Sequence, residues 1–292
     1  MIKSLLILIF TVILLIDSYT SMILKYQNQI LNLINQYPSI PITIDSSINT
    51  STTTTWEPGK GEYQFDSDLK LSKSSLLQRS NILIDKALEE DSTAQHSLGL
   101  LYHMGYGGVL QSDEYSTKWH AISALYGNID AIAVLGGCLR KGSGIKQNKE
   151  LGLELIYYAA EKLSPFGLVK KAHVIEQEEG EGKEKEILKL YELAASIPKS
   201  AIGLFNYGYM LYYTKNKKIR DREKAQQLFK VACDLAPNDG SDEAAHHLSL
   251  SLGGVDDVNG RNYMGIAAAL GNQEAQKELV AYKKMIESFF DS

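Results

Sequence analysis

The feature that most constrains this chain of 292 residues is a pattern that recurs about every 36 residues over residues 80–280. Pairs of residues that include a small side chain mark one half of each unit, at 86–87, 123–124, 159–160, 194–195, 232–233 and 267–268. Single small residues mark the other half, at Ala94, Ala131, Gly167, Gly203, Ala244 and Ala275. A regular period of this length is typical of paired helices stacked in a row. We therefore predict an all-α solenoid of about five helix-turn-helix repeats over residues 66–292.

The clearest unit begins at Ala94 and shows what its landmarks do. Ala94, Leu98 and Tyr102 recur every four residues, which predicts the buried stripe of a first helix. Gly99 lies inside that helix, where glycine costs about 1 kcal/mol in helix propensity. The cost is tolerable if the second helix must approach closely at that point, so we predict a close helix–helix contact there.

The same unit carries its own stop signals. Gly105 and Gly107 are expected to end the first helix, because glycine adopts the positive φ that helix-terminating turns need. Asp113 stands where it could cap the N-terminus of the second helix or complement its dipole. Gly127 is expected to end that second helix.

This pattern resembles the Sel-1-like repeat, a relative of the tetratricopeptide repeat. The first unit matches the repeat at Ala94, Leu98, Gly99, Tyr102, Gly105, Gly107, Trp119, Ala124 and Gly127. The resemblance implies a right-handed superhelix whose first helices line a concave, protein-binding surface. The family includes the luminal adaptor of the ubiquitin ligase of ER-associated degradation, so the resemblance also extends to ER protein quality control.

The N-terminus indicates the secretory pathway. Lys3 precedes the apolar run 5–16, which is too short to cross a bilayer as a helix and is followed by small residues. We expect residues 1–21 to form a cleaved signal peptide; the alternative is an uncleaved membrane anchor at residues 5–24. Residues 22–65 are expected to form a Ser/Thr-rich linker with a short amphipathic stretch at 22–37. Asn49 lies in the N-x-[ST] sequon of this linker and is the predicted glycosylation site.

Composition and motifs argue against several classes of chemistry. A net charge of −5 disfavours nucleic acid, which requires a basic surface. The two cysteines, Cys138 and Cys233, are far apart and have neither disulfide-scaffold nor zinc-site spacing. His96 and His103 share a helix face, but no cysteine or carboxylate set accompanies them, so a binding-surface role is favoured over a metal site. We predict no catalytic residues, no metal and no cofactor.

The candidate binding residues follow from helical geometry. When each first helix is numbered from its small anchor, positions one, five, eight, nine and twelve cluster on the buried side. Positions three, seven and ten lie opposite and are expected to face the groove. They are His96, Leu100 and His103 in the first unit, Ala133, Gly137 and Arg140 in the second, and Phe205, Tyr209 and Tyr212 in the fourth. The alternative is that a neighbouring helix, or the segment 22–37, covers them.

The sequence as a whole predicts a non-catalytic protein-binding adaptor in the ER lumen or outside the cell. Its expected ligand is a protein or peptide on the concave face, with a membrane complex as a further candidate partner. One alternative is a cytosolic or membrane-anchored repeat scaffold in signalling. Another is a secreted enzyme, as in cysteine-rich members of the repeat family, although this chain lacks their repeated cysteines.

Overall fold

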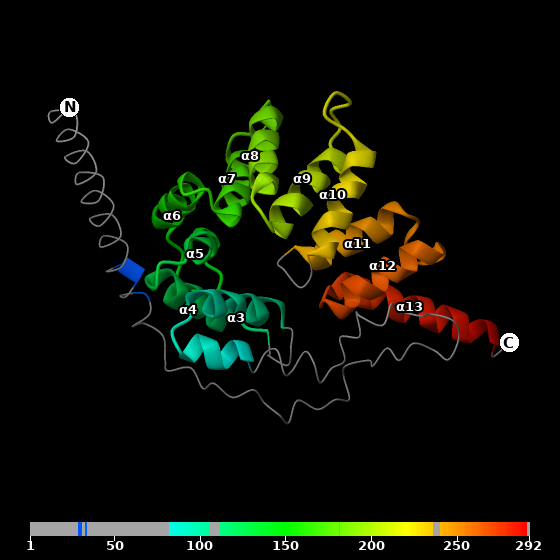
Figure 1. Cartoon of the computed structure of the whole chain (residues 1–292), viewed down its shortest axis with the longest axis horizontal. Coiled ribbons are helices and arrows are strands. Elements are labelled where there is room, and N and C mark those ends of the chain that lie inside the picture. Colours follow the sequence, from blue (N-terminus) through cyan, green and yellow to red (C-terminus); the bar gives the residue numbers. More distant parts are fainter. Residues whose placement is uncertain are drawn as a thin grey trace, which may run out of the picture.

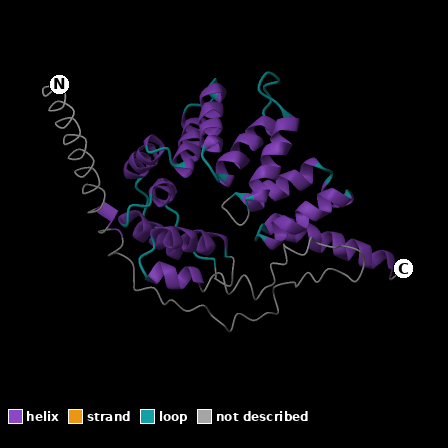
Figure 2. Cartoon of the chain, in the orientation of Figure 1, coloured by secondary structure: helices purple, strands orange, loops and turns teal. Residues whose placement is uncertain are grey.

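The computed structural model describes residues 29–30, 33, 82–105, 111–180, 182–235 and 240–290. Their regular structure is entirely helical (Figure 2). A helix at 82–88 precedes five helix pairs and a final long helix. The pairs are α3 (Ser92–Met104) with α4 (Asp113–Leu125), α5 (Ile129–Lys141) with α6 (Lys149–Glu161), α7 (Pro165–Glu178) with α8 (Glu184–Ser196), α9 (Ala201–Tyr213) with α10 (Arg222–Asp234), and α11 (Ser241–Ser251) with α12 (Val258–Ala269). A short 3-10 helix, η2 (Gly254–Asp256), lies between α11 and α12, and α13 (Gln273–Phe290) follows the last pair.

The predicted all-α solenoid of about five repeats is confirmed. The pairs follow one another around an arc from α3 and α4 to α11 and α12 (Figure 1). Residues 1–21, Asn49 and Gly107 lie outside the described residues, so the signal peptide and the glycosylation site stay predictions.

The first helix of each pair lies on the inside of the arc. Among the described residues, α5 contacts α7, α7 contacts α9 and α9 contacts α11. No comparable contact joins α6 to α8 or α8 to α10. The first helices from α5 to α11 therefore form a continuous inner layer, while the second helices α6, α8 and α10 splay apart on the outside.

Small residues allow consecutive pairs to pack backbone against backbone. A Cβ atom on Gly167 would lie 2.5 Å from the carbonyl carbon of Ala159, and one on Gly203 would lie 2.4 Å from that of Ala194. At the equivalent anchors, Ala131 and Ala244 are fully buried. The two landmarks of the sequence period are thus the two sides of one contact: the small pair ends a second helix, and the next small anchor packs on it.

A second close contact joins the two helices within a pair. A Cβ atom on Gly99 would lie 2.6 Å from the Cε1 atom of His120 on α4, so the predicted close approach at Gly99 is confirmed. Gly208 stands at the same place in α9, where a Cβ would lie 2.9 Å from the Phe229 ring on α10. Ala172, fully buried, holds this place in α7, where the sequence lacks the Leu-Gly pair.

Side-chain caps start most of these helices. Asp91 begins α3 by accepting hydrogen bonds from the backbone N–H groups of Thr93 and Ala94. The expected capping role of Asp113 is held instead by Ser112, whose hydroxyl accepts from the N–H of Tyr115. Asp113 is the first residue of α4, where its charge complements the helix dipole. Gly105 ends α3 in the left-handed conformation at φ 66°, as predicted.

Replacing Gly203 with alanine tests the contact between pairs. The new methyl group would meet the backbone of Ala194, which cannot move without shifting α8, so we expect a loss of about 1–3 kcal/mol despite the better helix propensity of alanine. The thermal midpoint should fall by several degrees, at about 2–4 °C per kcal/mol for a chain of this size. Circular dichroism melting measures the change.

Gly137→Ala is the matched control, since a Cβ there would meet only the flexible end of Lys170 at 3.1 Å. That variant should be as stable as the wild type or more stable by about 1 kcal/mol. Equal midpoints for the two variants would contradict the backbone contact at Gly203.

Candidate protein-binding surface

Five ring-bearing side chains form one cluster on the inner helices, and we call it the aromatic patch. It consists of Phe205, Tyr209, Tyr212 and Tyr213 of α9 together with His247 of α11. Helix α9 (AIGLFNYGYMLYY) contains no charged residue, and its Ser200 cap fixes where the helix begins. The patch exists because α9 and α11 pack side by side in the inner layer.

The rings of the patch contact one another closely. The centroid of the Tyr209 ring lies 5.8 Å from that of Phe205, 4.7 Å from that of Tyr213 and 5.2 Å from that of His247. The Tyr213 hydroxyl and the His247 Nδ1 atom are hydrogen-bonded at 3.0 Å. Tyr209 is 44% exposed and Tyr213 is 45% exposed, so two tyrosine rings are open to solvent side by side.

The patch is uncharged near neutral pH. Desolvation by burial, and secondarily the neighbouring His246, lowers the pKa of His247 to about 4. Burial likewise raises the pKa of the Tyr213 hydroxyl above its usual value. An apolar, uncharged surface with a few hydroxyl groups is the kind that aromatic anchors of a protein interface form.

The structure brings together the three predicted residues of the fourth unit. Phe205 and Tyr212 are half-buried, with ring centroids 6.0 and 6.3 Å from that of Phe229 on α10. Tyr209 is the exposed member of the three. The described part of the segment 22–37 does not cover them: Ile30 is buried in the apolar cluster of α4 to α7 instead, and Leu33 packs against that cluster.

The predicted residues of the first two units are largely covered. His96 is only 7% exposed, with its ring centroid 5.0 Å from that of Phe166 on α7, and Ala133 is fully buried. Leu100 is half-buried against the same apolar cluster. The expectation that positions three and seven face an open groove is therefore wrong for these two units, because the inner helices pack on one another. Gly137 faces Lys170 of α7 for the same reason.

Arg140 and His103 lie nearer the surface. Arg140 forms an ion pair with Glu178 at 3.1 Å and also contacts Gln177, so its charge is already paired within the chain. His103 is exposed and contacts the Asp113 carboxylate at 3.2 Å through Nδ1. Their ion-pair partners, Glu178 and Asp113, lie outside the aromatic patch.

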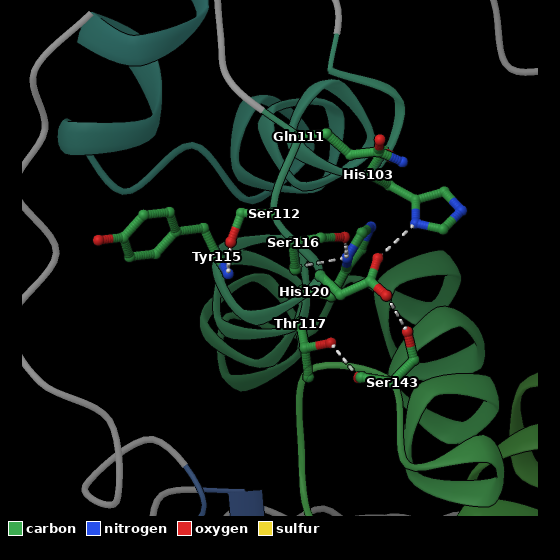
Figure 3. Close-up of polar contacts among 9 residues, drawn as sticks. His103, Gln111, Ser112, Tyr115, Ser116, Thr117, His120 and Ser143 are labelled. Carbon is green, nitrogen blue, oxygen red and sulfur yellow. Dashed lines mark hydrogen bonds and ion pairs between the residues drawn. The ribbon is translucent and has the colours of Figure 1, made fainter.

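His103, Asp113 and Ser143 form a serine–histidine–aspartate group in the wrong order for hydrolysis. Ser143 donates a hydrogen bond of 2.7 Å to Asp113, and His103 contacts the other carboxylate oxygen (Figure 3). In a hydrolytic triad the histidine stands between serine and carboxylate, so that it can remove the serine proton. Here the carboxylate stands between them. The hydrogen bond from Ser143 is the main cause that lowers the pKa of Asp113, and the contact with His103 lowers it to a smaller extent. The group joins the first pair to the turn after α5.

The described residues offer little other chemistry. They contain no group of three or more histidine, cysteine or acidic side chains that could hold a metal ion. Burial raises the pKa of the Cys233 thiol to about 11, which makes it a poor nucleophile. Within the part of the chain that the structure describes, no helix has both the length and the apolar character needed to cross a membrane.

Two buried histidines, His96 of α3 and His120 of α4, lie where this helix pair meets α7. His120 is fully buried, and its ring centroid lies 5.1 Å from that of His96. The His120 Nδ1 group donates to the Ser116 carbonyl at 2.7 Å, while His120 Nε2 and His96 Nδ1 have no hydrogen-bond partner among the described residues. Burial, followed by the charge of Lys170, lowers the pKa of His96 to about 4. Burial also lowers the His120 pKa, with smaller contributions from His96, Lys170 and His103.

The fold defines the class as an all-α solenoid of stacked helix-turn-helix repeats. The model of the Sel1 repeat matches residues 92–127, 129–162 and 201–237, which contain the pairs α3/α4, α5/α6 and α9/α10. The chain therefore carries Sel1 repeats, and the pairs α7/α8 and α11/α12 continue the same stacking outside the matched segments. Sel1 repeats typically mediate protein–protein interaction.

Three solved structures are similar to this chain at low identity. They are a protective antigen of uropathogenic Escherichia coli (21% identity, 68% of this chain and 43% of that one, TM-score 0.37), a Sel1 repeat protein from Oxalobacter formigenes (19%, 70% and 88%, TM-score 0.45) and an immunity protein from Pseudomonas aeruginosa (18%, 69% and 83%, TM-score 0.44). The chain thus spans less than half of the Escherichia coli antigen. A comparison with curated proteins gives no match.

Acidification should destabilise the chain through the buried histidine pair. The folded-state pKa of His96, about 4, lies below the 6.5 of the unfolded chain, so the unfolded state binds more protons between these values. The stability that the neutral ring contributes is present above pH 6.5 and is lost as the pH falls towards 4. For His96 alone the loss is about 2 kcal/mol at pH 5.

Denaturant unfolding of the wild type and of His96→Leu, at pH 7 and at pH 5, measures this effect. The variant replaces the ring with an apolar side chain that does not titrate. Between pH 7 and pH 5 its free energy of unfolding should therefore fall by about 2 kcal/mol less than that of the wild type. The same pH dependence in both proteins would show that His96 is not a buried neutral histidine.

Proposed function

We propose that this protein is a non-catalytic adaptor that binds a partner protein through the aromatic patch on α9 and α11. The observation that carries the proposal is the exposure of Tyr209 and Tyr213 side by side on a helix without charged residues. Stacking of the repeats uses Gly203, Tyr207, Gly208 and Leu211 of α9, which are buried, and does not require the two exposed rings.

Such a patch suits protein recognition for two physical reasons. Aromatic side chains carry a large apolar area and lose little conformational entropy on binding, so they dominate interface energetics. The half-buried rings of Phe205 and Tyr212 pack on Phe229 of α10 and contact the exposed rings of the patch. The patch is therefore preorganised. The partner gains contact area without having to order the surface that it binds.

The absence of catalysis is part of the proposal. It is supported by the order of the His103–Asp113–Ser143 group and by the raised pKa of Cys233. The buried histidines are neutral and enclosed, which suits a structural role better than proton transfer to a substrate.

We further propose that the adaptor works in the ER lumen or outside the cell. The more specific form of this proposal is a role in ER protein quality control. The support is the apolar run 5–16 behind Lys3 and the sequon at Asn49, both in the sequence alone. Membrane anchoring through residues 5–24 and a cytosolic scaffold in signalling are the alternatives. The localisation experiment below separates all three.

Expression of the full chain in a secretory host should give a product that starts near residue 21 or 22. It should be lighter than the full-length polypeptide by about 2 kDa once glycans are removed, at roughly 110 Da per residue. N-terminal sequencing and mass spectrometry before and after glycosidase treatment measure this, with Asn49→Gln as the control for the glycan. An intact N-terminus on a membrane-bound product would favour the anchor, and an intact soluble product would favour the cytosolic scaffold.

The double variant Tyr209→Ser, Tyr213→Ser tests the patch. Both rings are exposed, so the variant should fold normally, and it should lose at least tenfold in affinity because a central aromatic anchor is worth about 2 kcal/mol or more. The measurement is affinity for a partner recovered by cross-linking and pull-down with the wild-type chain.

The matched control is Tyr126→Ser, Tyr157→Ser, which removes two exposed tyrosines outside the patch, 48% and 36% exposed. It should retain full binding. If the patch variant binds the partner as tightly as the control does, the patch is not the binding site.

A further inference from the structure

A cluster of basic residues adjoins the aromatic patch at the end of α9. The segment that joins α9 to α10 reads TKNKKIRD and continues into Arg222, the first residue of α10. We call residues 215–222 the basic loop; its cations are Lys215, Lys217, Lys218, Arg220 and Arg222, all exposed. Five cations in eight residues contrast with the net charge of −5 of the whole chain.

The loop is held in a defined conformation. The backbone N–H of Asp221 donates to the Leu211 carbonyl at 3.1 Å, and the N–H of Arg220 donates to the Asn216 carbonyl at 2.9 Å. The Asn216 side chain accepts from the N–H of Lys218 at 3.1 Å, and Ile219 packs against the core. The cations therefore project from a turn that is fixed at both ends.

The folded chain pairs none of these charges with a carboxylate. The ion pairs found among the described residues include none of the five cations. Asp221, the acidic residue within the loop, caps α10 by accepting from the N–H of Lys224 at 3.0 Å. Cations near the end of α9 complement its dipole, but Arg222 stands at the start of α10, where the dipole disfavours positive charge. The helix dipoles therefore do not account for the Arg222 charge at the α10 end of the cluster.

The basic loop and the aromatic patch are continuous. The guanidinium group of Arg222 lies over the Tyr212 ring, 5.2 Å from its centroid, and Tyr213 lies two residues before Lys215, where the loop begins. A partner seated on Tyr209 and Tyr213 thus lies beside unpaired cations at the α10 end of the patch. This arrangement favours a partner that carries negative charge next to the group it places on the aromatic patch.

We infer that the partner presents an acidic peptide segment. Its Asp and Glu carboxylates pair with the basic loop while one of its aromatic or aliphatic side chains packs between Tyr209 and Tyr213. This inference rests on the proposed function and adds the chemistry of the partner. An acidic peptide fits better than a nucleic acid, because the basic loop is short and the chain as a whole repels phosphate.

Selection of a random dodecapeptide phage library on the full chain tests the inference. The enriched peptides should combine several acidic residues with an aromatic or aliphatic one. Fluorescence anisotropy then measures the affinity of the most enriched peptide, and of a version whose Asp and Glu are replaced by Asn and Gln. The acidic version should bind at least tenfold more tightly, and its affinity should fall as salt is raised.

Two four-site variants isolate the loop. Lys215→Glu, Lys217→Glu, Lys218→Glu, Arg220→Glu should weaken the acidic peptide at least tenfold. Lys146→Glu, Lys185→Glu, Lys189→Glu, Lys284→Glu makes the same change in net charge at exposed lysines elsewhere and should change affinity less than twofold. Circular dichroism confirms that both variants keep the helical fold.

The outcomes separate this inference from the proposed function. If Tyr209→Ser, Tyr213→Ser abolishes binding but the loop variant does not, the acidic segment is wrong and the aromatic patch stands. If neither variant affects binding, both fail. Enrichment of peptides without acidic residues, a failure to enrich any peptide, or tighter loop-dependent binding of a single-stranded 20-mer RNA would each overturn the inference.

Discussion

The close contact between the start of each first helix and the end of the preceding second helix sets the geometry of this solenoid. At Gly167 and Gly203 the backbones of consecutive pairs approach so closely that not even a methyl group fits. Because that contact repeats about every 36 residues, each pair is placed on the last in nearly the same way and an arc results.

This packing also determines which surfaces remain available. The first helices form a layer and cover one another, which buries Ala133 and His96. Burial also keeps His96 and its neighbour His120 neutral by lowering their pKa values. An aromatic surface stays open where an inner helix carries more large side chains than the layer encloses. That happens at α9, where stacking buries Tyr207 but leaves Tyr209 and Tyr213 exposed. The aromatic patch is thus a consequence of the arc and of an unusually aromatic first helix.

The sequence predicted the features that depend on one helix or one pair. The period located the repeats, helical spacing identified the buried stripe, and the interior glycine at position 99 correctly indicated a close second helix. Features that depend on several repeats could not be obtained this way. Helical spacing gives the face on which His96 lies, but not that Phe166, from two repeats further along, covers it.

The same reasoning explains the two patch residues that sequence analysis missed. Tyr213 follows Phe205 and Tyr209 at steps of four, so this helical stripe could have been found from the sequence. His247 comes from the neighbouring repeat, and nothing in its local sequence distinguishes it from His246, which pairs with Glu278. Its place beside Tyr209 follows only from the contact between α9 and α11.

Hydrogen exchange of the full chain, with and without its recovered partner, tests the central claim most directly. If the aromatic patch is the binding surface, protection on binding should be concentrated in peptides that cover α9 and α11, residues 201–213 and 241–251. Peptides from the outer helices α6 and α8 should exchange at unchanged rates. Protection confined to those outer helices, with α9 and α11 unaffected, would contradict the account.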